Sequence, residues 1–188
     1  MTNQTTKQTS SVYNKIAELY SKQFSKPLEH IKYFLNKIPK NGKILDAGCG
    51  AGNNSGYMTL RGFEVIGIDL SKKMLQLAEQ KFPKINFKQI DIKKIKFPPN
   101  SFDGILASYS LIHISKKDIP AVLRKLHRFL KKTGILFLVL QEGKTLYQIM
   151  KSNPINLAAQ ESTEGKNLSD QEMKKIIKTY KKQISVPN

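Results

Sequence analysis

The stretch ILDAGCGAGNNSG, residues 44–56, carries the most information about the fold. An apolar run ends in Asp46 and is followed by three glycines, Gly48, Gly50 and Gly52. Glycine-rich turns between a strand and a helix bind nucleotides, because a backbone without side chains can approach a ligand closely. The turn by itself leaves three kinds of ligand open: a dinucleotide, a nucleoside triphosphate, or a ligand with no phosphate.

On both sides of this turn, apolar runs typical of strands alternate with segments of helical periodicity. We expect strands at residues 43–48, 63–69, 85–91, 102–110 and 134–142. We expect helices at residues 11–24, 27–38, 52–61, 71–82 and 116–132. Ser71 is the expected cap of the fourth helix, and Gly134 is expected to end the fifth. This alternation predicts a doubly wound α/β fold, with a mostly parallel sheet and helices on both faces.

The 188 residues are enough for one domain with its own core. Residues 1–11 are polar and rich in Thr and Gln, so we expect a flexible tail there. Residues 12–143 carry the alternating pattern, whereas residues 144–188 have weak periodicity and one late helix beginning after Ser169. Little further strand is expected in that last segment, so the sheet is predicted to lack its last strand. A partner copy of the chain, in a homodimer, would be one way to complete this side.

The net charge of +18 invites a nucleic-acid interpretation. Only three of the 32 basic residues are arginines, however, and arginine supplies the bidentate contacts that phosphates and bases favour. The lysines are spread along the whole chain, which is typical of a solvated surface. We therefore favour a small-molecule partner, and RNA stays open on charge alone.

Other bulk features exclude several classes of protein. A single cysteine, Cys49, rules out an internal disulfide and agrees with a cytoplasmic location. No apolar run reaches the length of a membrane span, and residues 1–11 have no apolar core of a secretory signal. The sequence also has no Cys/His cluster with the spacing of a zinc site, so no metal is expected.

The residues around the turn distinguish the three ligands. A phosphate-gripping P-loop requires Lys and then Ser or Thr after its last glycine, and neither Gly52 nor Gly56 is followed by them. A dinucleotide turn requires a third glycine where this chain has Asn53. Asp46 would repel a pyrophosphate and favour a ligand with positive charge near the turn. These features disfavour an NAD-type oxidoreductase.

Two further acids end the next two strands. Asp69 lies at a position where an acid accepts hydrogen bonds from ribose hydroxyls. Asp91 follows the third strand and could accept from the amino group of adenine. Each could also be an ordinary turn or cap residue, and for Asp91 the two interpretations are equally plausible. A ligand with ribose, adenine, a cationic end and no phosphate describes S-adenosylmethionine.

At this point the sequence resembles the class I S-adenosylmethionine-dependent methyltransferases, in particular their small type 11/25 group. The resemblance covers about residues 12–143 and lies in YNKIAELYSKQFSKP, ILDAGCGAG, GFEVIGIDLSKKML, INFKQIDI, FDGILASYSLIHI and LHRFLKKTGILFLVLQEG. It implies a Rossmann-like methyltransferase fold that binds S-adenosylmethionine, with S-adenosylhomocysteine as product. It also implies these cofactor contacts: Asp46, Gly48 and Gly50 to the methionine end, Asp69 and Leu70 to the ribose, Asp91 and Ile92 to the adenine, Ser108 on the sulfonium side, and Tyr13 and Tyr20 in an N-terminal helical lid.

The resemblance implies transfer of a methyl group by in-line displacement, which needs no dedicated catalytic residue. His113 is a candidate general base, although a histidine in an apolar segment is more often structural. The acceptor is not identified, and a small molecule is the default. The unusual residues 144–188 favour one alternative, a catalytically impaired cofactor-binding or interaction protein of the same fold. An RNA methyltransferase and an NAD-type oxidoreductase are less favoured.

Overall fold

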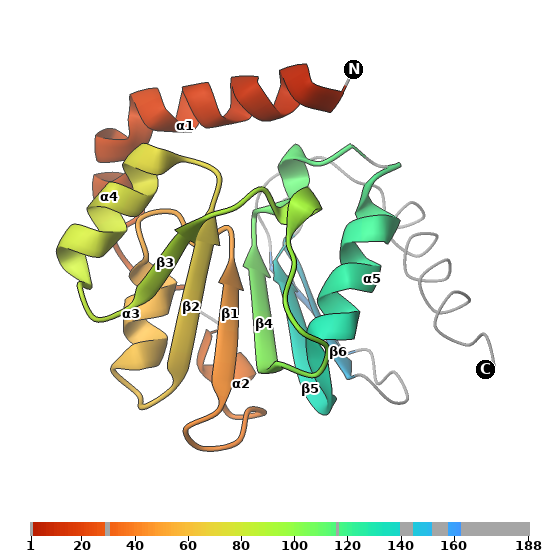
Figure 1. Cartoon of the computed structure of the whole chain (residues 1–188). Coiled ribbons are helices and arrows are strands. Elements are labelled where there is room, and N and C mark those ends of the chain that lie inside the picture. The colour runs from red at the N-terminus through yellow and green to blue at the C-terminus, as the bar shows by residue number, and fades with distance from the viewer. Residues whose placement is uncertain (1, 29–30, 116, 140–144, 152–157, 163–188) are drawn as a thin grey trace.

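The computed structural model describes residues 2–28, 31–115, 117–139, 145–151 and 158–162. They form a seven-stranded sheet in the order β3-β2-β1-β4-β5-β6-β7 (Figure 1). The strands are β1 Lys43–Ala47, β2 Glu64–Asp69, β3 Asn86–Gln89, β4 Phe102–Ser108, β5 Leu130–Val139, β6 Thr145–Lys151 and β7 Ala158–Ser162. The first five are parallel, whereas β6 runs antiparallel to β5 and β7 antiparallel to β6.

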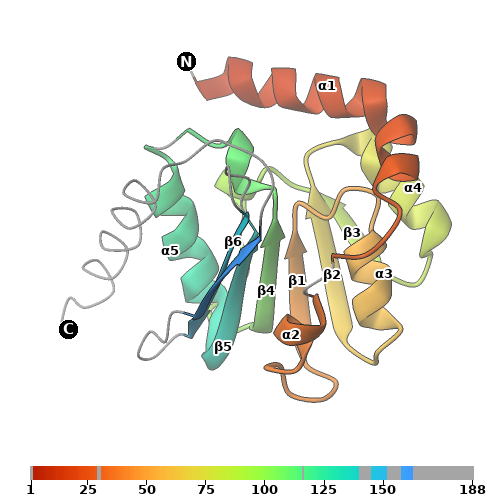
Figure 2. The ribbon, with the colours of Figure 1, turned by 180° about the vertical axis from the view of Figure 1, so that it is seen from behind.

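Helices cover both faces of the sheet, as the doubly wound prediction requires. Figure 2 shows one face with α2 and α3, and Figure 1 shows the opposite face with α5. The α-helices are α1 Thr2–Gln23, α2 Ile31–Leu35, α3 Asn53–Thr59, α4 Lys72–Lys81 and α5 Ile119–Phe129. Two short 3₁₀ helices, η1 Ile92–Lys94 and η2 Leu111–His113, follow β3 and β4. The predicted fold class is confirmed.

Each face of the sheet has its own hydrophobic core. Alternate residues of a strand point to opposite faces, so neighbouring apolar residues in β1 serve different cores. Ile44 packs with Phe34 of α2 and Phe137 of β5, and the two phenyl rings stack with their centroids 5.4 Å apart. Leu45 packs on the other face with residues of α5 such as Leu126. The central strands are therefore apolar on both sides and hold their carboxyl ends in fixed positions.

The order of the strands reverses beside β1, because β2 and β3 extend the sheet on one side and β4 and β5 on the other. Ligands of doubly wound folds bind at this switch point, outside the carboxyl ends of the strands. Figure 1 shows α1 lying across those ends. The glycine turn follows β1 directly, so it lies at the switch point beneath α1.

The N-terminal helix is longer than the sequence pattern indicated. It begins at Thr2, so the described part of the expected tail, residues 2–11, is helical. No glycine or proline interrupts residues 2–23, and α1 packs against α4. Ser10, inside the expected tail, donates a hydrogen bond to the carbonyl of Leu70 at 3.3 Å. Such long-range contacts stabilise a helix that local composition does not predict.

The boundary between α5 and β5 also differs from the expectation. The helix ends at Phe129, the strand begins at Leu130, and Gly134 lies inside β5 instead of ending the helix. Leu130 pairs with Phe102 of β4, and the register then shifts before Gly104. Pairing of Leu130 with Phe102 therefore begins the strand directly after the helix.

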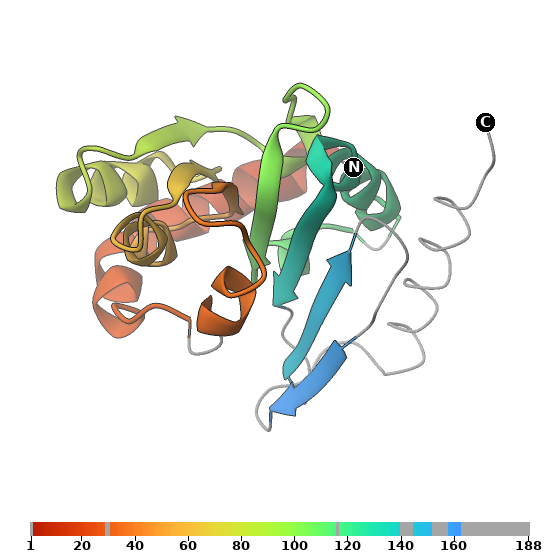
Figure 3. The same cartoon turned by 90° about the horizontal axis from the view of Figure 1, so that it is seen from below.

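The predicted loss of the last strand is corrected by β6 and β7, which extend the sheet beyond β5 (Figure 3). The segment TLYQIMK of β6 contains β-favouring residues, and pairing with the apolar strand β5 gives it a partner that the sequence pattern alone did not reveal. The late helix expected after Ser169 lies outside the described residues. Among the residues that the structure describes, no helix has the length and apolar character needed to cross a membrane.

Candidate functional site

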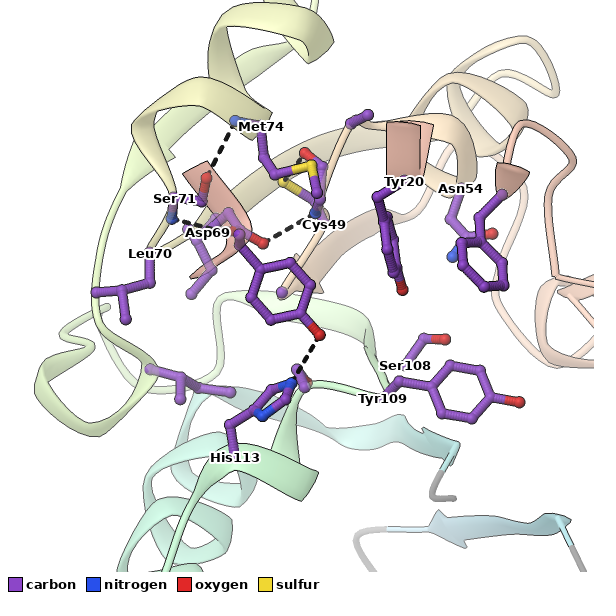
Figure 4. A pocket seen from close by; sticks show the side chains of 18 of the residues that line it. Tyr20, Cys49, Asn54, Asp69, Leu70, Ser71, Met74, Ser108, Tyr109 and His113 are labelled. Atoms are coloured by element: carbon purple, nitrogen blue, oxygen red, sulfur yellow. Dashed lines mark hydrogen bonds between the residues drawn. The ribbon is translucent and has the colours of Figure 1, made fainter. Parts of the chain in front are cut away.

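A pocket of about 370 Å³ opens at the carboxyl ends of β1, β2 and β4 (Figure 4). This volume falls in the range of small-molecule sites, roughly 300–1,000 Å³. Its walls come from α1, the glycine turn, the segments that follow β2, β3 and β4, and the connection from α1 to α2. Residues far apart in sequence thus meet in one cavity.

The glycine turn needs glycine for two different reasons. Gly48 and Gly50 have φ angles of 90° and 54°, which residues with side chains adopt rarely. A Cβ on Gly48 would lie 2.3 Å from the Cβ of Ser110, so the turn and the segment after β4 could not approach each other. A Cβ on Gly50 would meet no atom within 4 Å, because Gly50 faces open space.

Asp69 joins the glycine turn to the end of β2. One carboxylate oxygen accepts from the backbone N–H of Gly50 at 2.9 Å, and the other accepts from Ser71 N–H at 2.8 Å. Burial raises the pKa of the Asp69 carboxyl, while these backbone hydrogen bonds oppose the rise. Each oxygen keeps a second lone pair, so Asp69 can still accept from a ligand in the pocket that it lines.

Asp46 is fully buried in β1, two residues before Gly48, and does not itself line the pocket. Ser55 of α3 donates a hydrogen bond to its Oδ2 at 2.6 Å. Its Oδ1 has no hydrogen-bond partner among the described residues. Burial raises the pKa of Asp46 to about 7, and the Ser55 hydrogen bond opposes that rise. A buried carboxylate oxygen without a partner is costly, so it indicates a role beyond packing.

The residues after β3 and β4 complete the far side of the pocket. Asp91 and Ile92 both line it. Asp91 also caps η1, since its side chain accepts from Lys93 N–H at 2.9 Å, so the cap interpretation and a binding role coexist. Ser108 lines the pocket at the end of β4, and Tyr109 follows it with a φ of 52°. A positive φ in a tyrosine is strained, and such strain is common at functional sites.

Helix α1 supplies the two tyrosines that cover the pocket. The rings of Tyr13 and Tyr20 meet edge to face with centroids 5.6 Å apart, and both line the cavity. The hydroxyl of Tyr13 lies 2.8 Å from Nε2 of His113, which comes from η2 after β4 (Figure 4). Burial raises the pKa of Tyr13 to about 12 and lowers the pKa of His113. Either group can donate in this bond, depending on which ring nitrogen of His113 carries the proton.

A second contact fixes α1 in this place. The Oδ1 of Asn14 accepts from Ser71 Oγ at 2.7 Å and from the backbone N–H of Lys73 at 3.1 Å. Ser71 is the predicted N-cap of α4, and its Oγ accepts from Met74 N–H at 3.2 Å. One serine therefore caps a helix, contacts α1 and neighbours Asp69.

The structure brings the predicted cofactor residues together around one cavity, except that Asp46 lies just outside its lining. Sequence reasoning missed Asn53, which it treated only as the absence of a glycine, and it missed Asn54; both line the pocket. It also missed Phe24 and Tyr109. In the part of the chain that the structure covers, no group of three or more His, Cys, Asp or Glu residues could hold a metal ion.

Comparison with known proteins identifies similar sequences and folds. Residues 44–134 match a family described as a methyltransferase domain. The chain is 33% identical over 132 residues to a putative methyltransferase, YqeM, of Bacillus subtilis, covering 66% of this chain and 53% of that protein. It is 32% identical over 117 residues to the phosphoethanolamine N-methyltransferase of Plasmodium falciparum, covering 59% of this chain and 44% of that protein.

Comparison with a solved structure also identifies a methyltransferase. The chain superimposes on a TehB-like SAM-dependent methyltransferase from Corynebacterium glutamicum with a TM-score of 0.62 and 25% identity, covering 68% of this chain and 73% of that one. The chain spans about half the length of the two curated relatives named above. The family match over residues 44–134 includes the glycine turn and the acids at the strand ends.

Proposed function

Since the chain belongs to the class I S-adenosylmethionine-dependent methyltransferases, we propose that it transfers a methyl group from S-adenosylmethionine to a small-molecule acceptor. One observation carries the proposal. Asp69 holds the glycine turn through Gly50 and lines the same pocket as Asp91. This arrangement provides hydrogen-bond acceptors for ribose and adenine, and the glycine turn is not followed by the lysine of a P-loop.

The residues in the pocket fit this cofactor. In the proposed arrangement, Asp69 with Leu70 accepts the ribose and Asp91 with Ile92 the adenine. The methionine end lies against Gly48 and Gly50, with Ser108 on the sulfonium side. Asp46 supports the assignment, because its buried carboxyl lies behind this end, two residues before Gly48, where a negative charge favours an ammonium group in the pocket.

The cofactor supplies an already activated methyl group, which an acceptor lone pair attacks while the carbon–sulfur bond breaks. The chain's own residues then have to align the reactants and exclude water. Tyr13 and Tyr20 cover the pocket, and the bond from Tyr13 to His113 joins this cover to the segment after β4. His113 lines the pocket and is the candidate general base for an acceptor that must lose a proton, a role that requires it to release Tyr13 if Nε2 takes that proton.

A small acceptor agrees with the relatives, which include the phosphoethanolamine N-methyltransferase of Plasmodium falciparum. Net charge is the sole argument for RNA. The homodimer was suggested by a missing strand, and β6 and β7 remove that argument.

Calorimetric titration tests the proposed cofactor. We expect S-adenosylmethionine and S-adenosylhomocysteine to bind the wild-type protein and NAD to fail. A subsequent methylation screen with phenols, amines, small acids and RNA identifies the acceptor class by transfer of labelled methyl groups. Binding of NAD without binding of either adenosyl ligand would contradict the proposal. Tight cofactor binding with no transfer to any acceptor would favour the impaired cofactor-binding protein instead.

We expect Tyr13→Phe to weaken S-adenosylhomocysteine binding about two- to tenfold, because it removes the hydrogen bond to His113, and such a bond contributes about 0.5–1.5 kcal/mol. His113→Ala should have an effect of similar size. Because both variants remove the same bond, their effects should not add in the double variant. Calorimetry on the four proteins measures this coupling. Fully additive losses of affinity would mean that the hydrogen bond between Tyr13 and His113 does not hold α1 over the ligand.

A further inference from the structure

Two asparagines follow the glycine turn as the first residues of α3, and each bonds to a distant backbone group. Asn54 Oδ1 accepts from the backbone N–H of Leu28 at 2.8 Å. Asn53 Nδ2 donates to the backbone carbonyl of Phe24 at 2.7 Å. A backbone N–H only donates and a carbonyl only accepts, so the orientation of both amide groups is determined. We call residues 24–28, which lead from α1 towards α2, the strap.

The strap forms one wall of the pocket. Phe24, Lys26, Pro27 and Leu28 all line the cavity, as do the two asparagines. The ring of Phe24 lies against that of Tyr20, with centroids 4.4 Å apart. Figure 4 shows Tyr20, Asn54 and Tyr109 on the side of the pocket away from Asp69. Asp69 and Asp91 are the carboxylates among the described lining residues, so the strap side is free of acids and combines aromatic and apolar side chains with Lys26 and the two asparagines.

The asparagines connect this wall to the turn. Gly48, Gly50 and Gly52 lead without a break into Asn53, and Gly52 N–H donates to Cys49 O at 3.0 Å. Asp69 fixes the turn from its other side through Gly50. The two side-chain bonds thus join the start of α3 to the backbone of the strap.

We propose that Asn53 and Asn54 are positioning residues that couple the cofactor turn to the strap, so that cofactor binding builds the acceptor wall. The inference rests on the proposed function, in which the turn holds the methionine end. It implies that the cofactor binds before the acceptor. It also implies an acceptor with an apolar or aromatic body, because such a body fits against Tyr20, Phe24 and Leu28.

Amide hydrogen exchange of Leu28 tests the coupling directly, since this N–H is the donor of the bond to Asn54. In the wild-type protein, we expect saturating S-adenosylhomocysteine to slow exchange at Leu28 at least tenfold. In Asn54→Ala, exchange should be at least tenfold faster than in the ligand-free wild type, and the ligand should no longer slow it. Calorimetry should show that the variant still binds S-adenosylhomocysteine, within tenfold of the wild-type affinity.

Two nearly isosteric variants separate positioning from general stability. Asn54→Asp keeps an oxygen that accepts from Leu28 N–H, so ligand-dependent protection should be retained. Asn53→Asp loses its donor and places a carboxylate against the carbonyl of Phe24, so it should release the strap. A general loss of stability would affect neighbouring positions alike, and thermal unfolding shows whether each variant is folded.

The outcomes separate the two proposals. Failure of S-adenosylhomocysteine to bind the wild-type protein would defeat the proposed function and, with it, the coupling. Binding to the wild type without slower exchange at Leu28 would overturn the coupling alone. Equal behaviour of Asn54→Asp and Asn53→Asp would also overturn it.

Discussion

Asp69→Ala should lower the affinity for S-adenosylhomocysteine about a hundredfold or more, measured by calorimetry. A hydrogen bond to a charged group contributes about 1.5–3 kcal/mol, and each 1.4 kcal/mol is a tenfold change in affinity. Loss of two ribose contacts therefore accounts for about two orders of magnitude. The substitution also removes the acceptor that holds Gly50 and Ser71, so the turn itself loses its support.

Two further variants show whether the effect is specific. Asp118→Ala removes an acid at the start of α5 that neither lines the pocket nor makes a side-chain cap, so it should bind as the wild type does. Asp69→Asn keeps one acceptor oxygen and should show an intermediate loss. Thermal unfolding tests whether Asp69→Ala remains folded. A folded Asp69→Ala protein with unchanged affinity would remove the main support for the proposed cofactor site.

The residues that the sequence identified best are those whose position follows from topology. Asp46, Asp69 and Asp91 lie at or just after the ends of parallel strands, and such ends meet at one edge of a sheet. Glycines with positive φ, such as Gly48 and Gly50, are likewise recognisable because few other residues adopt that conformation. Local patterns therefore predicted the turn, the acids and the fold class.

The features that the sequence did not reveal depend on contacts between distant segments. Asn53 and Phe24 are 29 residues apart, and no periodicity relates a side-chain amide to a backbone carbonyl at that distance. Strand β6 likewise depends on pairing with β5. Local propensity is a weak guide where tertiary contacts decide the structure.

Stability should fall as the pH rises from about 4 to about 7, because of Asp46. Its pKa is about 7 in the folded protein, against an ordinary value of 3.8. Between these values the folded protein keeps a proton that the unfolded chain has released, so each pH unit lowers the free energy of unfolding by about 1.4 kcal/mol. The full loss is on the order of 4 kcal/mol above pH 7. Asp46→Asn should remove this slope, measured by denaturant unfolding at several pH values.

Ligand binding should have the opposite effect on the Asp46 carboxyl: burial favours its protonated form, and the ligand should favour its charged form. An ammonium group near Asp46 favours the charged carboxylate, so S-adenosylhomocysteine should release close to one proton on binding at pH 6 and far less at pH 8. Calorimetry in buffers of different ionisation enthalpy measures this release, and Asp46→Asn should abolish it. Ser55→Ala is the matched control: without that hydrogen bond the pKa of Asp46 rises further, and the release extends to higher pH. Equal proton release in the wild type and Asp46→Asn would mean that another group faces the ammonium. If the release does belong to Asp46, the charged form of this carboxylate has two opposite effects. It lowers the stability of the ligand-free protein above about pH 4, and it is the form that the ligand stabilises.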